Sequence, residues 1–206
     1  MKSALFKLVL AAFLSIAITV PSFAQSSCPA IGSAKPGGAP LPITKQQLNR
    51  LKNRTEVPSV VEPMKVGDIL HFDDRHDPEL EKKAVVLEGF LLGFKREGPE
   101  SPNCYSDTRR DFHMWVGPRW PTSPEMGMAL RVQAVVVEPT PAMQDLHPTW
   151  DEENFNELVG QQIRVTGWLM FDPEHPDQIA HTRGTLWEVH PVMKIEVFHG
   201  GSWVEF

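Results

Sequence analysis

From position 84 onward, hydrophobic and polar residues alternate in short stretches that are typical of β-strands. Residues 111–116 alternate strictly, with Phe112 and Met114 on one predicted face and Asp111 and His113 on the other. The predicted strands are residues 84–95, 111–116, 130–138, 162–171 and 185–198.

One helix is predicted between the third and fourth of these strands, at residues 151–159, where acidic residues open the segment and Gly160 follows it. Gly89 and Gly93 inside the first strand indicate bulges or a sharp bend. The order strand, strand, strand, helix, strand, strand is that of an OB-fold. We therefore predict a mainly β protein, a five-stranded OB-like Greek-key barrel with one helix between strands three and four, plus an N-terminal arm. Another small β-barrel or a β-sandwich is the alternative.

The first 24 residues have the layout of a secretory signal peptide, with Lys2 and Lys7, an apolar run at 8–20 and small residues up to Ala24. The apolar run is shorter than the roughly 20 residues that span a bilayer, so a retained anchor is the weaker alternative. Lipidation at Cys28 is weaker still. Cleavage after Ala24 predicts a secreted or periplasmic protein without membrane attachment.

The segment after the signal peptide is predicted to be a flexible and partly helical arm. Residues 25–42 are rich in Ser, Gly, Ala and Pro, which favours a flexible lead. Thr44 and Gln47 have the spacing of a capping box, which predicts a short helix at 45–53. The predicted domains are a signal peptide at 1–24, the arm at 25–83 and the OB-like barrel at 84–206.

Charge and cysteine content narrow the class of protein further. The net charge of −6 becomes −8 when Lys2 and Lys7 leave with the signal peptide, and an acidic domain disfavours nucleic acid as a partner. Cys28 and Cys104 are the only cysteines, and in an exported protein they form either one disulfide or two unpaired thiols.

Imidazole and carboxylate side chains recur on the predicted strand faces and at the strand ends. Such groups can bind a divalent metal ion or carry out acid–base chemistry near neutral pH. The candidate ligand-binding residues are Asp111, His113, Glu138, Glu188 and His190. The candidate metal ligands are His113, Glu138, Asp172, His175 and His190. Their spacing matches no metal motif. The alternative is that they are outward-facing polar positions or hydrogen bonds at the barrel rim.

Four short motifs occur in a fixed order through the predicted barrel. They are D-x-H at 111–113, E-x-x-P at 138–141, V-T-G at 165–167 followed by F-D-x-x-H at 171–175, and E-x-H-P-V at 188–192. The series resembles uncharacterised secreted bacterial proteins with an OB-like barrel, over roughly residues 85–197. The resemblance implies a fold and an exported context, and it implies no activity.

The leading hypothesis is a non-catalytic exported module that binds a small molecule, a glycan or a protein partner on the face that carries His113, Glu138 and His190. The alternative is a metal-dependent hydrolase, distantly nuclease-like in fold, with a divalent metal ion at the same residues. A third hypothesis is an interaction protein whose arm docks a partner. If the histidines lie in a surface site, replacing them should change stability by less than about 0.5 kcal/mol. If they satisfy buried groups, each replacement should cost roughly 1–3 kcal/mol.

Overall fold

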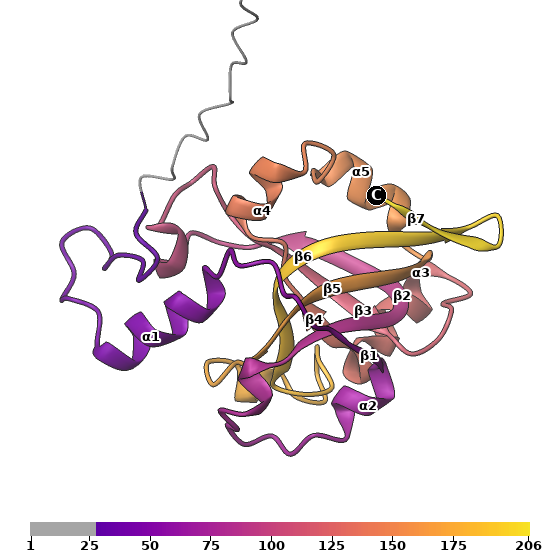
Figure 1. The fold of residues 1–206 in the computed structure, drawn as a ribbon, viewed down its shortest axis with the longest axis horizontal. Coiled ribbons are helices and arrows are strands. Elements are labelled where there is room, and N and C mark those ends of the chain that lie inside the picture. The colour runs from indigo at the N-terminus through magenta and orange to yellow at the C-terminus, as the bar shows by residue number, and fades with distance from the viewer. Residues whose placement is uncertain (1–27) are drawn as a thin grey trace, which may run out of the picture.

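The structure, a computed structural model, describes residues 28–206. The predicted signal peptide and its cleavage site lie outside the described residues. The helices are α1 (Ile43–Lys52), α2 (Val66–Leu70), α3 (Pro124–Ala129), α4 (Pro141–Leu146) and α5 (Glu152–Leu158). The strands are β1 (Glu62–Lys65), β2 (Ala84–Arg96), β3 (Phe112–Gly117), β4 (Val135–Val137), β5 (Gln162–Phe171), β6 (Trp187–His199) and β7 (Ser202–Glu205) (Figure 1).

Five strands close into a barrel in the order β2-β3-β4-β6-β5, and β5 returns to β2. Strands β4 and β6 run parallel, whereas the other neighbouring pairs of the barrel are antiparallel. Helix α5 follows β4 and precedes β5. The strand order and the helix position are those of an OB-fold, so the predicted OB-like barrel is confirmed.

Strand β2 pairs with two neighbours because it bends in its middle. Its first half pairs with β5 and its second half with β3, and the register shifts between Leu91 and Gly93. Gly93 has a φ of +148°, which residues with a side chain rarely adopt. The predicted bulge in this strand is therefore present at Gly93.

One side of each strand fills the barrel interior. On β3, the side chains of Phe112, Met114 and Val116 belong to the buried apolar core, as the strict alternation predicted. Phe155 of α5 lies edge-on to Phe112, with ring centroids 4.9 Å apart. Helix α5 therefore packs onto the core, and the outer side of β3 carries His113 and Trp115.

The third strand is much shorter than predicted. Residues 130–138 were expected to form it, but Leu130–Gln133 is a 3-10 helix and only Val135–Val137 is a strand. Leu130 and Val136 pack in a second, smaller apolar cluster outside the barrel core. The apolar pattern of this segment thus reflects burial against two separate clusters rather than one long strand.

The N-terminal segment is more ordered than its composition suggested. The predicted helix is present as α1, but it begins at Ile43 after Pro42, and no side chain caps it. The capping box at Thr44 was therefore wrong. Strand β1 pairs with β2, and Val66 of α2 is buried in the barrel core. Part of the core is thus built by residues that the sequence analysis assigned to the arm.

Further elements extend the barrel beyond the five predicted strands. Strand β7 pairs with the end of β6 in a hairpin that projects from the barrel, and α4 precedes α5 between β4 and β5 (Figure 1). Within residues 28–206, the helices are all too short or too polar to cross a membrane.

Candidate functional site

The polar residues singled out in the sequence meet on the outer face of three adjacent barrel strands. His113 alternates with the core residues of β3, so its side chain leaves the barrel on the opposite face. Glu138 follows β4 and lies beside β3 and β6. Glu188 and His190 occupy the outward positions of β6, where Trp187 and Val189 point into the core. We call Asp111, His113, Glu138, Glu188 and His190 the polar cluster.

Backbone hydrogen bonds hold Glu138 between its two neighbouring strands. Its N–H donates to the carbonyl of Val189 at 3.0 Å, and its carbonyl accepts from the N–H of Val192 at 3.0 Å. The N–H of Phe112 donates to the carbonyl of Pro139 at 3.1 Å. The carboxylate of Glu138 is therefore positioned by the barrel itself and not by a loop.

His113 lies between two carboxylates. Its Nδ1 atom is 2.8 Å from Oε1 of Glu97 and 3.0 Å from Oε1 of Glu138. Its Nε2 atom is buried without a hydrogen-bond partner among the described residues. His113 thus contacts Oε1 of Glu138 and leaves Oε2 of the same carboxylate available to another partner.

His190 faces the second oxygen of Glu138. Its Nδ1 atom lies 3.1 Å from Oε2 of Glu138 and 3.5 Å from Oε2 of Glu188, and its Nε2 atom lies 4.0 Å from Oδ2 of Asp111. These contacts lack the alignment of hydrogen bonds, so both ring nitrogens of His190 are unpartnered, as is Oδ1 of Asp111. Three buried polar atoms of the cluster therefore lack an aligned hydrogen bond, which is uncommon for buried groups.

The cluster is buried rather than exposed. Asp111 is 1% exposed, His113 4%, Glu138 6%, Glu188 1% and His190 0%. The expectation that the histidines lie in a surface site was therefore wrong. The side chains do leave the barrel, but other segments cover them.

Charges inside the cluster shift one another's pKa values. Burial lowers the pKa of His190, but the carboxylates of Glu138, Glu188 and Asp111 together outweigh burial and raise that pKa to about 9. Burial raises the pKa of Glu138, yet the two neighbouring imidazoles hold it well below its ordinary value. Burial raises the pKa of Asp111 to about 7. Glu138 is therefore the group that keeps its negative charge near neutral pH.

Asp172 and His175, which the sequence analysis proposed as metal ligands, belong to a separate ion-pair group. His175 Nδ1 lies 2.6 Å from Oδ2 of Asp172, which also accepts a hydrogen bond of 3.0 Å from the buried Arg183. Arg183 donates its other bond to Glu188 at 2.6 Å. The carboxylate of Asp172 is thus already neutralised by two partners, and Arg183 links this group to the edge of the polar cluster.

Two residues of the site were missed in the sequence. Glu97 lies just beyond β2, and its N–H donates to the carbonyl of Asp111 at 2.9 Å, which continues the pairing with β3. Counted from Phe94, after the bulge at Gly93, the period-two pattern of β2 would have placed Glu97 on the outer face. Lys52 of α1 is 3% exposed, and nearby carboxylates raise its pKa despite burial. No local pattern identifies Lys52, because it reaches the site through the fold.

Among residues 28–206, two groups of three side chains could hold a metal ion, and both include Glu138. One group is Asp111, Glu138 and His190, and the other is Glu97, His113 and Glu138. In each group the three ligand atoms lie within 4.8 Å of one another. The first group is fully buried and contains the unpartnered atoms of Asp111 and His190.

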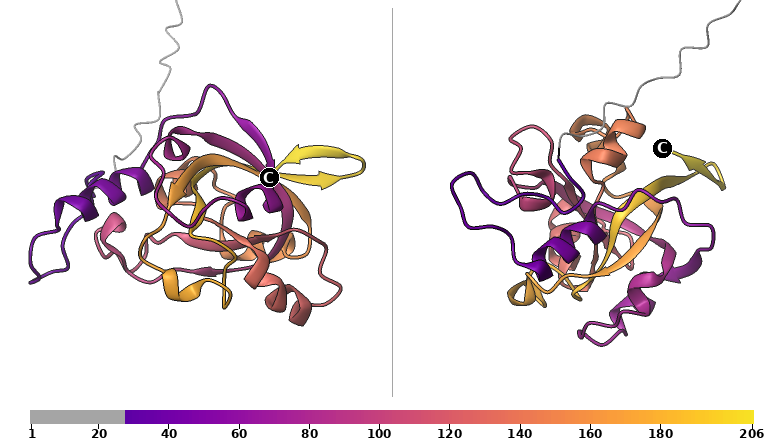
Figure 2. Two further views of the ribbon diagram at one scale, coloured as in Figure 1. Left: turned by 90° about the horizontal axis from the view of Figure 1, so that it is seen from below. Right: turned by 60° about the vertical axis from the view of Figure 1, so that its left-hand side comes forward.

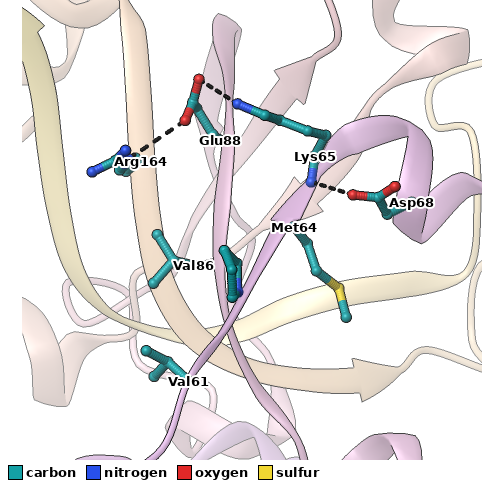
Figure 3. Close-up of a pocket in the computed structure, with 8 residues that line it drawn as sticks. Val61, Met64, Lys65, Asp68, Val86, Glu88 and Arg164 are labelled. Atoms are coloured by element: carbon teal, nitrogen blue, oxygen red, sulfur yellow. Dashed lines mark hydrogen bonds and ion pairs between the residues drawn. The ribbon is translucent and has the colours of Figure 1, made fainter.

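A separate groove of about 370 Å³ lies along β1 and shares no residue with the cluster (Figure 3). Its charged side chains neutralise one another: Glu88 lies 2.6 Å from Nζ of Lys65 and 3.5 Å from Nε of Arg164. The groove therefore offers little unpaired charge to a ligand, and the polar cluster is the stronger candidate.

Comparison of the chain with family models, with curated proteins and with solved structures gave no match. The class of protein is therefore defined by the fold and the site together, as an OB-like barrel with a buried imidazole–carboxylate cluster. The resemblance to secreted bacterial barrel proteins stays a prediction.

Proposed function

We propose that the mature protein is an exported metal-binding module that holds a divalent transition-metal ion, best matched by zinc, with Asp111, Glu138 and His190. The observation that carries the proposal is the set of unpartnered buried atoms on Asp111 and His190 beside the ionised Glu138. Unsatisfied polar atoms are costly in a protein interior, and a bound cation that displaces the proton of His190 would satisfy them.

The chemistry and spacing of the donors support a transition metal. Mixed imidazole and carboxylate donors suit zinc, whereas magnesium and calcium prefer oxygen alone. Donors that each lie about 2.1 Å from a zinc ion are at most roughly 4.2 Å apart. The donors here lie within 4.8 Å of one another, so small side-chain movements would suffice.

The neighbouring residues fit the role of outer partners. His113 contacts the other oxygen of Glu138, and Glu97 contacts His113. Outer partners of this kind orient ligating side chains and typically change metal affinity 10–100-fold. His113 is thus assigned to positioning Glu138, in place of the direct ligation expected from the sequence.

Burial supports an ion over the larger ligands considered earlier. A glycan or a protein partner needs an open face, and the cluster residues are at most 6% exposed. A hydrolase would also need its substrate to reach the ion. An ion requires only the small space between the three donors, so a binding role is favoured over catalysis.

Zinc titration of the protein from residue 25 onward, stripped of metal beforehand, tests the proposal. Wild type should bind zinc and gain thermal stability as zinc is added. Asp111→Asn and His190→Gln should each weaken binding by more than about 100-fold, and His113→Gln by roughly 10–100-fold. His175→Gln is the matched control, because His175 is outside both groups, and it should bind zinc as wild type does. Manganese serves as the comparison ion.

Two results would overturn the proposal. One is wild type that binds neither zinc nor manganese while its circular dichroism shows a folded barrel. The other is an equal loss of affinity in His175→Gln and His190→Gln, which would place the ion at the Asp172 group instead.

A further inference from the structure

Helix α1 covers the face of the barrel that carries the polar cluster. It contacts β6 and the 3-10 turn Ser101–Asn103, and in the right-hand view of Figure 2 it lies in front of the barrel strands. Lys52, in its last turn, lies with Nζ 3.9 Å from Oε2 of Glu100 and 3.9 Å from Oε2 of Glu174. The carboxylates of Glu138 and Glu188 also raise the pKa of Lys52, so its buried ammonium group lies on the acidic side of the polar cluster.

The covered face is the one that OB-folds use for ligands. Such folds bind on the face of strands two and three, between the loop after strand one and the loop after strand four. In this chain those strands are β3, which carries His113, and β4, which Glu138 directly follows. The two loops bring Glu100 and Arg183. The chain's own helix thus occupies its ligand face.

Polar contacts hold α1 in place. The side chain of Asn49 accepts a hydrogen bond of 3.2 Å from Ser101, and that of Asn53 donates one of 2.9 Å to the carbonyl of Pro102. Arg54, just after the helix, donates to the carbonyls of Leu169 at 3.0 Å and His190 at 3.3 Å. Helix α1 buries the apolar side chain of Leu48, but neither apolar cluster of residues 28–206 includes a side chain of α1.

A disulfide joins the segment before α1 to the same turn. Cys28 and Cys104 are bonded, which resolves the two alternatives for these cysteines, and they are separated by 76 positions in the chain. Because a polar interface gains little from the hydrophobic effect, a covalent tie between its two sides contributes a large share of its stability.

We propose that α1 is a lid over the metal site, that the Cys28–Cys104 disulfide holds the lid closed, and that a dithiol reductant opens it and releases the ion. The inference rests on the proposed function. In the opening step the reductant breaks the Cys28–Cys104 bond, both cysteines become thiols, and the dithiol becomes a cyclic disulfide after giving up two electrons and two protons. Lys52 then leaves the cluster together with α1.

Two readouts on the zinc-loaded mature protein test this inference. Trypsin cleavage after Lys52 reports lid opening and needs no metal, while cleavage after Arg164 in β5 reports whether the barrel stays intact. The rate at which a coloured chelator extracts zinc reports access to the site. Reduction by dithiothreitol should raise cleavage after Lys52 and zinc extraction at least tenfold, with cleavage after Arg164 unchanged.

The double variant Cys28→Ser/Cys104→Ser is the matched control. Without reductant it should match reduced wild type in both readouts, and dithiothreitol should change it no further. If cleavage after Lys52 does not respond to reduction, α1 is not a disulfide-held lid. If cleavage responds and zinc extraction does not, the lid does not control the site, although the proposed function stands. If no zinc binds in either redox state, the proposed function fails and the inference fails with it.

Discussion

Glu138, directly after β4, and His190 of the parallel strand β6 lie side by side, with Oε2 of Glu138 3.1 Å from Nδ1 of His190. The pair is fully or almost fully buried, so each charge depends on the other for its stability. The other oxygen of Glu138 contacts His113, so one carboxylate pairs with two imidazoles.

Glu138→Gln should therefore be strongly destabilising in the metal-free protein. The change leaves the His190 cation buried beside a neutral amide, and removing one partner of a buried pair costs about 3–5 kcal/mol. Urea unfolding at pH 7 measures the effect. Glu157→Gln on the exposed side of α5 is the control and should change stability by less than about 0.5 kcal/mol. Equal stability of the two variants would contradict a charged pair at His190.

The Asp172 group predicts a loss of stability in acid. Burial would raise the pKa of Asp172, but His175 and the Lys52 and Arg183 cations hold it well below the ordinary value of 3.8. A carboxyl with a depressed folded-state pKa stabilises the fold above its unfolded pKa, and this contribution is lost as the pH falls through about 4 and below. Wild-type stability should thus decline from about pH 5 to pH 3.

Asp172→Asn should remove part of that acid dependence and lower stability at pH 7 by about 3–5 kcal/mol, because Arg183 loses a buried partner. Asp145→Asn breaks a half-exposed pair with Arg109 and should cost no more than about 1 kcal/mol. Urea midpoints measured between pH 7 and pH 3 compare the two. If the stability of Asp172→Asn falls between pH 7 and pH 3 as much as that of wild type, other carboxyl groups cause the loss in acid.

Phe155 tests the packing of the helix that completes the OB-like fold. Its ring is 0% exposed and contacts Phe94 and Phe112 of two barrel strands. Phe155→Ala should cost about 3–5 kcal/mol by leaving a cavity. Phe198→Ala, at a ring that is 40% exposed on the β6–β7 hairpin, should cost much less. Similar losses in thermal unfolding would mean that α5 is not part of the core.

Export gives a prediction about the N-terminus. Lys2 and Lys7, the apolar run and Ala24 predict cleavage after Ala24, so the mature chain should begin at Gln25. N-terminal sequencing of protein from an exporting bacterial host measures this. An intact Met1 on protein recovered from the cytosol would contradict export.

Strand alternation was sufficient to predict the barrel and to place Asp111 with His113 and Glu188 with His190. This worked because the core residues of β3 and of the first part of β6 occupy every second position, so the polar residues between them share the outer face. The prediction of a long third strand failed because Leu130 and Val136 are apolar for another reason, namely their burial in the second apolar cluster.

Burial of the polar cluster could not be predicted from the sequence, because the segments that cover it are far from the cluster residues along the chain. Lys52 and Glu100 reach the site only through the docking of α1 and of the turn that carries Cys104. A composition rich in Gly, Ser and Pro indicated a flexible lead, yet a disulfide and side-chain hydrogen bonds tie this lead to the barrel. Such contacts between distant residues leave no periodic pattern in the sequence.

Anomalous X-ray diffraction at the zinc edge, from crystals of the mature protein grown with zinc, tests the metal site most directly. We expect one strong peak within about 2.3 Å of side-chain donors of Asp111, Glu138 and His190, absent from crystals of His190→Gln. Zinc-bound crystals with no peak at Glu138, or with their peak at Asp172 and His175, would contradict this expectation.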